Sequence, residues 1–357
     1  MISPDSPHVH VIGLGLIGAS CALALGQLGW RVSGEDRDEV VNLAAHETGV
    51  VGEGALDEAT SLVVIATPAS SVAALANRVL ASVKNEQLLV TDVAGVKGSI
   101  VADVADPRFL AGHPMAGSEQ RGLAGARADM FHGCTWVLTP TARTRPATYG
   151  HLHGILRDIG ATVVAVSADD HDRLVALASH VPHLLAGALM NEAARAAEDD
   201  AVLLQLAAGG FRDMTRIAAG DPSIWPDVLF ENRRAVVRTL TSLESRLGAL
   251  RAALEADDRG VIAESLRTAS VARRQLPGRA LSSENLAYLR VVVSDQPGVL
   301  ASVTMAASDL LVNIYDIEIA HGIESAGGTL LLAVDAGQAS LLLDALVKRG
   351  FSVGLES

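Results

Sequence analysis

The chain has 357 residues, and its 28 lysines and arginines against 41 aspartates and glutamates give a net charge of −13 at pH 7. With 49% hydrophobic and 3% aromatic residues, the composition excludes a disordered or fibrous protein, and the length predicts two or three globular domains. The acidic charge and the lack of any lysine or arginine run disfavour a nucleic-acid partner.

The first segment, Val9–Trp30, has 22 residues without a charged side chain and is long enough to span a bilayer. Five glycines and His10 interrupt it, and Asp5 stands where a secretory signal would carry basic residues. We therefore expect a buried strand, a glycine turn and a buried helix, and no membrane segment. Two cysteines, Cys21 and Cys134, are too few for a disulfide framework and indicate a reducing cytoplasm.

Residues 1–167 alternate between short β-branched runs and helical stretches. This alternation predicts a doubly wound, Rossmann-type α/β domain, with a parallel sheet and helices on both faces. The expected strands are His8–Gly13, Arg31–Gly34, Leu62–Ala66, Leu88–Asp92, Cys134–Leu138 and Thr162–Val166.

Residues 168–280 are rich in alanine, leucine, arginine and glutamate, and they contain no convincing strand. Asp170–Ala197 and Pro226–Asp257 carry apolar residues at helical spacing, with a break at Pro182. We expect an all-α domain that buries apolar faces against a partner subunit, and hence a homodimer.

The C-terminal part, residues 286–357, returns to mixed α/β patterns after a linker at Gln275–Glu284 (QLPGRALSSE). It is predicted to form a small βαββαβ domain, in which one helix follows the DQPGVL turn and another precedes the final strand. The expected strands are Leu286–Val293, Val312–Ala320, Gly328–Val334 and Phe351–Leu355.

A G-x-G-x-x-G motif lies between the first predicted strand and the first predicted helix. In such a motif the first glycine permits a tight turn, the second lets the backbone approach a pyrophosphate, and the third lets helix and strand pack closely. The helix N-terminus adds unpaired N–H groups. The alternative is a structural turn without a dinucleotide. The predicted cofactor contacts are Gly13, Leu14, Gly15, Leu16, Ile17 and Gly18.

The second predicted strand is followed by an acidic residue, Asp36, which can accept hydrogen bonds from ribose hydroxyls and would repel a 2′-phosphate. NAD is therefore favoured over NADP, although the guanidinium of Arg37 leaves NADP open. Thr67 and Pro68 follow the third strand, at the carboxyl edge of the sheet where a nicotinamide could lie.

Four further segments contain uncommon residues: Asp92–Lys97 (DVAGVK), His113–Glu119 (HPMAGSE), Ser179–His183 (SHVPH) and Gly209–Trp225 (GGFRDMTRIAAGDPSIW). Together they make the chain resemble prephenate dehydrogenases from about residue 8 to Asn232. The resemblance implies NAD-dependent oxidative decarboxylation of prephenate to 4-hydroxyphenylpyruvate in tyrosine biosynthesis. Arogenate dehydrogenases share the pattern, so arogenate remains the alternative substrate.

The resemblance assigns catalysis to His113, which we expect in the loop after the Asp92 strand. Hydride leaves C4 of the substrate for the nicotinamide, and the imidazole accepts the proton of the C4 hydroxyl. A neutral imidazole with an ordinary pKa of about 6.5 suits this task. Without the resemblance, a His-Pro pair in a loop is more simply explained as structural.

A doubly anionic substrate needs a local cation in so acidic a protein. The resemblance assigns carboxylate binding to Arg216, whose fork can hold a carboxylate bidentately. Ser179 and His183 are four residues apart and so share a helix face, although Pro182 is expected to bend that helix. They are predicted to line the substrate pocket, whereas His180 is expected to be structural.

Three further residues match substrate-pocket positions of the family: Glu119, Gly209 and Trp225. The resemblance implies that the tryptophan reaches the pocket across a dimer interface. The alternative for Trp225 is an ordinary core position, since tryptophans are highly buried on average.

One position departs from the family pattern. Asp92 and Gly95 are predicted to contact the cofactor, but the family commonly has serine where this chain has Gly95. That hydroxyl would lie near His113 and the nicotinamide. We expect Ser118 or a water molecule to take its place.

The segment that starts at Asp295 (DQPGVL) resembles an ACT domain, a βαββαβ module that binds amino acids. The implied effector site comprises Asp295, Gly298, Asn313 and Ile314, and tyrosine, the end product, is the expected effector. The alternative is a dimerisation module without a ligand. No metal site is expected.

Two other functions fit the sequence less well. A β-hydroxyacid dehydrogenase would need a catalytic lysine in the second domain, and none occurs between Ala168 and Asn285. A non-catalytic, NAD-binding amino-acid sensor is suggested by Gly95 and the C-terminal module. The retention of His113 and Arg216 argues against a sensor, which needs no proton acceptor.

Overall fold

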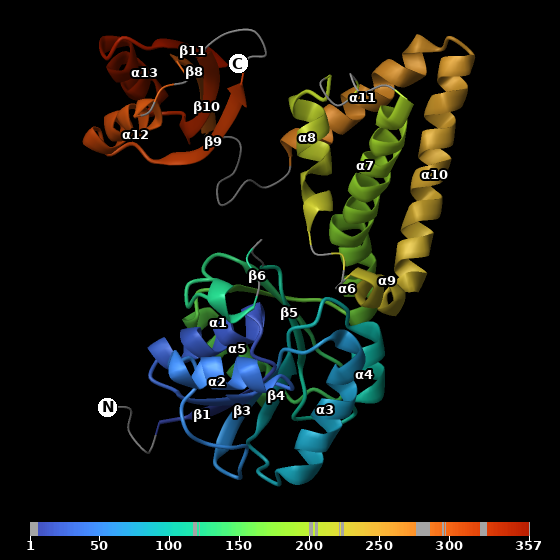
Figure 1. Cartoon of the computed structure of the whole chain (residues 1–357), viewed down its shortest axis with the longest axis vertical. Coiled ribbons are helices and arrows are strands. Elements are labelled where there is room, and N and C mark those ends of the chain that lie inside the picture. The colour runs from blue at the N-terminus through green and yellow to red at the C-terminus, as the bar shows by residue number, and fades with distance from the viewer. Residues whose placement is uncertain are drawn as a thin grey trace. The chain divides into compact units, whose positions relative to one another are not determined.

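The computed structural model describes residues 6–116, 120, 122–199, 203, 206–220, 222, 225–275, 286–294, 296, 298–321 and 327–356 (Figure 1). The chain divides into two compact units. The first comprises Met1–Arg195 with Thr215–Glu244, and the second comprises Ala196–Met214 with Ser245–Ser357.

The first unit begins as an α/β domain and continues into helices. Its elements in chain order are β1 (His8–Ile12), α1 (Leu16–Gln27), β2 (Arg31–Glu35), α2 (Glu39–Glu47), β3 (Thr60–Ile65), α3 (Ala69–Ser82), β4 (Leu89–Asp92), α4 (Gly98–Asp103), β5 (Ala111–Pro114), η1 (Leu123–Gly125), β6 (Thr135–Thr139), α5 (Pro146–Asp158), β7 (Thr162–Ala165), α6 (Ala168–Val175), the π-helical turn η2 (Ala176–His180), α7 (Val181–Asp199), the 3₁₀ turn η3 (Arg216–Ala219), α9 (Trp225–Glu231) and α10 (Arg233–Glu255).

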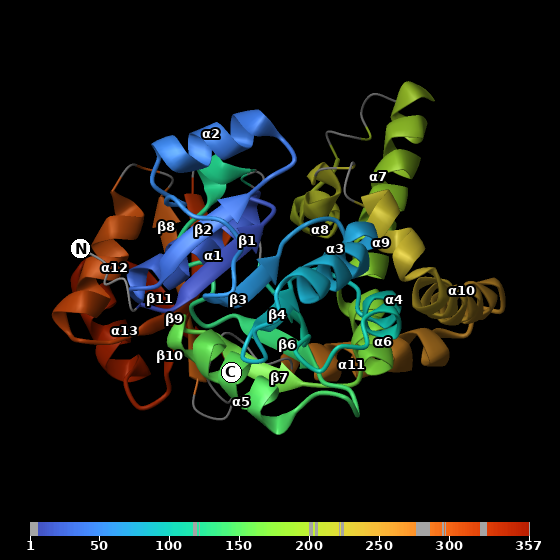
Figure 2. The ribbon, with the colours of Figure 1, turned by 90° about the horizontal axis from the view of Figure 1, so that it is seen from below.

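Parallel strands in the order β2-β1-β3-β4 form a four-stranded sheet (Figure 2). A bridge between Val90 and Phe109 joins β4 to the segment that leads into β5. Strand β5 pairs antiparallel with β6, and β6 pairs parallel with β7. The predicted Rossmann-type sheet is confirmed, but the sequence prediction of six parallel strands missed β5, which introduces an antiparallel pair.

Helices cover both faces of this sheet (Figure 1). On one face, Val9 and Val11 pack with α1 and α5. On the other face, Val63 and Ile65 pack with α3 and α4. Strands buried on both faces are rich in aliphatic and β-branched residues, which is why these segments could be predicted as strands. The uncharged Val9–Trp30 segment is β1, the glycine turn and α1, as expected.

The predicted long helix from Asp170 is interrupted by η2, the π-helical turn that ends two residues before Pro182. Proline has no N–H, and its ring clashes with the carbonyl four residues earlier. The helix therefore adopts the wider π-helical geometry for one turn before Pro182. By length and composition, Ala168–Glu198 could cross a membrane, but helices of a soluble protein pass the same test.

The second unit contains helices and a separate sheet. Its elements are α8 (Gly209–Thr215), the end of α10, α11 (Arg259–Arg274), β8 (Leu286–Ser294), α12 (Val299–Asp309), β9 (Ile314–His321), β10 (Gly327–Asp335), α13 (Ala339–Lys348) and β11 (Ser352–Glu356). The antiparallel sheet has the order β11-β8-β10-β9 and packs against α12 and α13. The predicted βαββαβ order is confirmed. Most of the predicted linker, from residue 276, lies outside the described residues.

Candidate active site

Two glycines of the fingerprint are required by close packing. Gly13 has a φ of +96°, and a β-carbon there would lie 2.5 Å from the Ala66 carbonyl oxygen. A β-carbon on Gly18 would collide with the Gly13 carbonyl oxygen. The absence of side chains at these positions therefore lets β1, β3 and α1 meet at the turn.

The middle glycine faces open space. A β-carbon on Gly15 would meet no atom within 4 Å, and no side chain caps the N-terminus of α1, which begins at Leu16. Gly15, Leu16 and Ile17 are partly exposed. Free N–H groups beside an open backbone suit an anionic group such as a pyrophosphate, so the turn fits a dinucleotide.

The structure corrects the role of Leu14. This residue is completely buried, and its N–H donates to Oδ2 of Asp36 at 2.8 Å. Leu14 therefore offers a cofactor neither its side chain nor its amide. Asp36, just after β2, also accepts a hydrogen bond from the Asp38 amide at 3.0 Å, so its carboxylate is fixed beside the glycine turn, while Arg37 is exposed.

Thr67 and Pro68 lie at the carboxyl end of β3, next to the same turn. A β-carbon on Gly13 would be 3.1 Å from the Thr67 methyl group. The Ser71 hydroxyl donates to Thr67 Oγ1 at 2.9 Å, and Pro68 precedes the first residue of α3. These residues and the fingerprint therefore form one continuous edge.

Asp92 ends β4 and pairs with Ile65 at the end of β3, so it lies at the same edge, but its side chain is buried. Asp92 and Lys97 are both completely buried, and Lys97 Nζ donates to Asp92 Oδ2 and, at 2.8 Å, to the Gly112 carbonyl. The amides of Ala94 and Gly112 donate to the same carboxylate. The Asp92 carboxylate thus joins β4 to β5 in this structure, and the contact of Asp92 with a cofactor stays a prediction.

His113 lies on β5, and not in a loop as predicted. Its Nδ1 is 2.9 Å from Nε2 of His171, and Nδ1 of His171 is 2.8 Å from Oδ1 of Asp172. The amides of Lys97 and Gly98 each donate to Asp172 at 2.8 Å. The sequence analysis did not identify these three linked side chains, although the adjacent His171 and Asp172 in α6 were a visible signal.

The surroundings of His113 favour its neutral form. Burial lowers the pKa of His113 well below its usual value, and nearby positive charge on Lys97, His171 or His180 would act in the same direction. A neutral imidazole can accept a proton at neutral pH.

Gly95 lies against the other edge of the His113 ring. A β-carbon on Gly95 would be 3.8 Å from both Cε1 and Nε2 of His113, which is an ordinary van der Waals contact. The two ring nitrogens therefore face different neighbours, Nδ1 toward His171 and Nε2 toward Gly95.

The π-helical turn orients the SHVPH segment. His180 is buried, and its Nδ1 lies 3.2 Å from Nδ2 of Asn232, which also donates to the Asp172 carbonyl at 2.8 Å. Burial lowers the pKa of His180 to about 4. His180 is thus buried and hydrogen-bonded within the fold, whereas Ser179 is only half-buried.

His183 stacks on Trp225, with ring centroids 3.7 Å apart and planes 15° apart. A β-carbon on Gly220 would be 3.4 Å from His183 Cε1, so the end of η3 lies beside this pair, and η3 begins at the exposed Arg216. Trp225 was expected to reach the pocket from a partner subunit. In this structure it contacts His183 of its own chain and is half-buried, so it is not a core residue.

The remaining predicted site residues lie in the second unit or outside the described residues. Glu119, Ser118 and Asp295 lie outside the described residues. Gly209 begins α8, and Gly298, Asn313 and Ile314 also belong to the second unit. Gly298 has a φ of +91° directly before α12, as a strand-to-helix turn requires. Among the described residues, no group of three or more histidine, cysteine or acidic side chains could hold a metal ion.

Comparison with known proteins gives consistent matches. Residues 21–165 match the family model "Prephenate dehydrogenase, nucleotide-binding domain", and residues 167–268 match "Prephenate dehydrogenase, dimerization domain". The prephenate dehydrogenase of Bacillus subtilis (strain 168) is 32% identical over 340 residues, which cover 91% of each chain.

Two solved structures are similar as well. Prephenate dehydrogenase from A. aeolicus, in complex with hydroxyphenyl propionate and NAD+, is 28% identical with a TM-score of 0.70, and the match covers 77% of this chain and 100% of that one. Synechocystis arogenate dehydrogenase is 28% identical with a TM-score of 0.66, covering 76% and 100%.

Proposed function

The chain belongs to the prephenate dehydrogenase family, and on this premise we propose that His113 is the base in an NAD-dependent oxidative decarboxylation of prephenate to 4-hydroxyphenylpyruvate. The observation that carries the proposal is the position of His113: its Nε2 faces Gly95 at the edge of a buried strand, and its lowered pKa keeps the ring neutral. A neutral imidazole so placed can accept the proton of the C4 hydroxyl.

The reaction needs a base only transiently. NAD, when bound, supplies the acceptor for the hydride that leaves C4. Loss of carbon dioxide makes the ring aromatic, and the overall reaction releases no proton. His113 therefore takes the hydroxyl proton at Nε2 as the carbon–oxygen bond gains double-bond character. It returns the proton to the phenolate oxygen once the ring is aromatic.

The cofactor is held by this chain's own edge residues. The amides at the start of α1, beside Gly15, would bind the pyrophosphate, and Asp36 would accept hydrogen bonds from the ribose. We propose NAD over NADP because a 2′-phosphate would meet the Asp36 carboxylate. Thr67 and Pro68 would border the nicotinamide.

Substrate recognition is assigned to the SHVPH segment and to η3. Arg216 would bind a substrate carboxylate, and Ser179, His183 and Trp225 would line the pocket near it. Glu119 and Gly209 are further candidates on the strength of the sequence resemblance. Arogenate, which carries an amino group in place of the keto oxygen, remains the second candidate substrate, because an arogenate dehydrogenase is among the similar structures.

The first test is the absorbance of NADH with purified protein, NAD and prephenate, repeated with arogenate and with NADP. We expect NAD to be reduced when prephenate is the substrate, and we expect no reduction with arogenate or with NADP. His113→Asn should lower turnover by about 10²- to 10⁴-fold while NAD binding is retained. His46→Asn, on the exposed end of α2, is the matched control. A His113→Asn protein that turns over normally contradicts the proposal, and no reduction with any pair favours the NAD-binding sensor.

We further propose a division into residues 1–167, 168–280 and 286–357, a homodimer formed through the helical region, and a cytoplasmic location. The match to a family dimerization domain supports the homodimer.

The βαββαβ order supports an ACT-like C-terminal module, with tyrosine as effector near Asp295, Gly298, Asn313 and Ile314. Titration calorimetry should detect heat when tyrosine is added. Absence of heat together with unaltered kinetics would leave a dimerisation module without a ligand.

A further inference from the structure

Behind His113 lies a chain of two more titratable side chains. His171 is 1% exposed and meets His113 edge to face, with ring centroids 5.1 Å apart and planes 71° apart. Its two ring nitrogens are both engaged, Nε2 by His113 at 2.9 Å and Nδ1 by Asp172 at 2.8 Å. The proposed function uses only the first member of this chain.

The carboxylate at the end of the chain decides where the protons lie. Burial by itself would raise the pKa of Asp172, but hydrogen bonds from His171 and from the Gly98 and Lys97 amides outweigh burial and hold that pKa below its usual value. An ionised carboxylate can only accept hydrogen bonds, so His171 carries its proton on Nδ1.

The tautomer of His113 follows from that of His171. A neutral His171 with its proton on Nδ1 presents a lone pair at Nε2, so His113 must donate from Nδ1. This leaves the lone pair of His113 on Nε2, the nitrogen that faces Gly95. A base needs its lone pair on that side to take a proton from a substrate.

We propose that His171 and Asp172 are positioning residues that fix the reactive tautomer of His113 and stabilise its imidazolium. The proposal rests on the proposed role of His113 as the base. When Nε2 takes the hydroxyl proton, His113 becomes positive, and its Nδ1–H bond to His171 strengthens under the negative charge of Asp172. The proton on Nε2 returns to the phenolate, so no proton has to leave through the chain.

The other charged groups near His113, His171 and Asp172 disfavour an imidazolium at His113, so the negative charge of Asp172 is needed to stabilise it. Lys97, which follows β4, is paired with Asp92, but its positive charge still opposes an imidazolium at His113. His180, from η2, is bonded to Asn232. Among these neighbours, Asp172 is the negative group to which His113 is joined by hydrogen bonds through His171.

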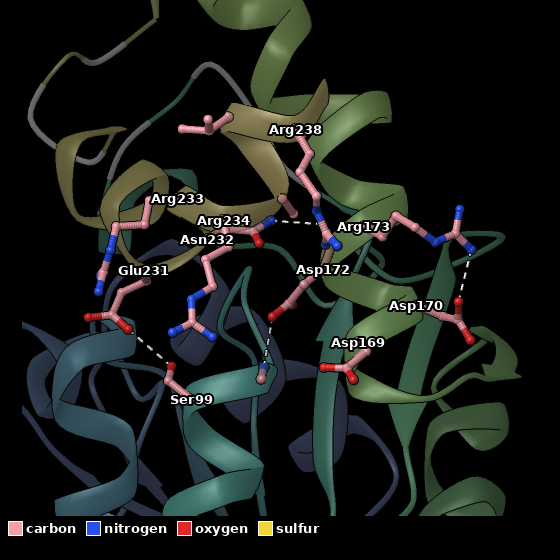
Figure 3. A pocket seen from close by; sticks show the side chains of 13 residues that line it. Ser99, Asp169, Asp170, Asp172, Arg173, Glu231, Asn232, Arg233, Arg234 and Arg238 are labelled. Atoms are coloured by element: carbon pink, nitrogen blue, oxygen red, sulfur yellow. Dashed lines mark hydrogen bonds and ion pairs between the residues drawn. The ribbon is translucent and has the colours of Figure 1, made fainter. Parts of the chain in front are cut away.

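Asp172 can also be reached from outside. Its side chain is 15% exposed and helps to line a pocket of about 1110 Å³. In Figure 3, Asp172 extends from α6 toward the start of α4, while Arg173 pairs with Asp170 on the same helix. Ser99 and Glu231 form another hydrogen bond in this pocket. A small carboxylate could therefore enter the space left by a shortened residue 172.

The test is the steady-state rate of Asp172→Ala with saturating NAD and prephenate over a range of pH. The expected loss of kcat is on the order of 10²-fold with KM little changed, and added formate should restore part of the rate.

The acid limb of the pH profile should also move to lower pH, because removal of a negative charge lowers the pKa of His113 further. A purely structural role would not move that limb. Asp170→Ala, in the same pocket, is the matched control and should keep the wild-type rate.

Two more variants keep the proposal open to refutation. Asp172→Asn preserves the side-chain volume if the alanine variant does not fold. His171→Gln can still accept the Nδ1–H bond of His113 but loses the link to Asp172, and it should lower kcat at least about tenfold with the same shift of the acid limb. Wild-type rates and an unmoved limb in the folded variants overturn the proposal, while an inactive His113→Asn leaves the proposed function standing.

Discussion

Gly95 lies beside the Nε2 edge of His113, and the sequence resemblance predicts a serine at this position in the family. A β-carbon there would make ordinary contacts at 3.8 Å, and the backbone of Gly95 is not in the left-handed region. A serine at this position therefore needs no rearrangement, and its hydroxyl could reach Nε2 of His113.

We predict that Gly95→Ser leaves kcat/KM unchanged or raises it, because the added hydroxyl orients a group that already functions without it. The measurement is NADH formation with prephenate. Gly112→Ser is the contrasting variant, since a β-carbon there would lie 2.8 Å from Trp136 Nε1 and should destabilise the fold. A collapse in turnover by a folded Gly95→Ser protein would refute the idea.

The buried pair of Lys97 and Asp92 gives a second prediction at the residue scale. Lys97→Met leaves the Asp92 carboxylate buried without its counter-charge, so the free energy of unfolding should fall by about 3–5 kcal/mol. Urea unfolding measures this loss. Lys84→Met, at an exposed position, should change stability by less than about 0.5 kcal/mol. Equal stabilities for the two variants would show that the pair contributes little.

At the scale of elements, the strands that could be predicted are those whose residues alone indicate a buried strand. β1 (HVHVI), β3 (TSLVVI) and β4 (LVTD) are rich in valine, isoleucine, leucine and threonine. β5 has the sequence Ala-Gly-His-Pro, and glycine and proline are depleted in strands. Only its pairing with β6 makes it a strand, so His113 was expected in a loop.

The site residues that could be predicted are likewise those that belong to local sequence motifs. The fingerprint, His113 and the SHVPH segment could be found because each is a local motif. The contact of His113 with His171 spans 58 residues, and that of Lys97 with Asp172 spans 75, so neither leaves a local pattern. The ion pair of Asp92 with Lys97 was not predicted either, because a polar residue at a strand end does not by itself indicate a buried partner.

Helix α4 gives a prediction at this scale. Its first residue is Gly98, whose amide binds Asp172, and a β-carbon there would lie 2.9 Å from Asp172 Oδ2. Gly98→Ala should therefore displace the carboxylate and lower kcat about tenfold, which corresponds to roughly 1.4 kcal/mol. Steady-state kinetics give the loss.

Gly154→Ala is the control for that substitution. Gly154 lies inside α5, where a β-carbon would meet nothing within 4 Å, so alanine should raise the free energy of unfolding by about 0.5–1 kcal/mol without affecting kcat. If Gly98→Ala behaved in the same way as Gly154→Ala, the fixed position of Asp172 would not matter for the reaction.

At the scale of the whole molecule, an acidic protein keeps several histidines neutral in its interior. Among the residues that the structure describes, burial lowers the pKa of five histidines of the first unit: His8, His10, His113, His180 and His183. His8 and His10 share the Ser33 hydroxyl at 2.7 and 2.8 Å, far from the strand ends that form the site. Low pH should therefore lower the stability of the whole unit as well as the rate of the reaction.

We predict that the first unit loses stability as the pH falls from about 6.5 toward 4. In this window the unfolded chain binds protons at histidines that the folded chain keeps neutral, so the free energy of unfolding decreases with falling pH. His180, with its pKa lowered to about 4, alone accounts for about 3 kcal/mol when titration is complete. Asp172 and Asp106, whose pKa values are also lowered, reduce the free energy of unfolding only below about pH 4.

Urea unfolding at a series of pH values measures this dependence. The free energy of unfolding should change less with pH for His180→Gln than for wild type, and as much as in wild type for His46→Gln. A stability that stays flat between pH 7 and 5 would mean that the buried histidines reach water before the unit unfolds.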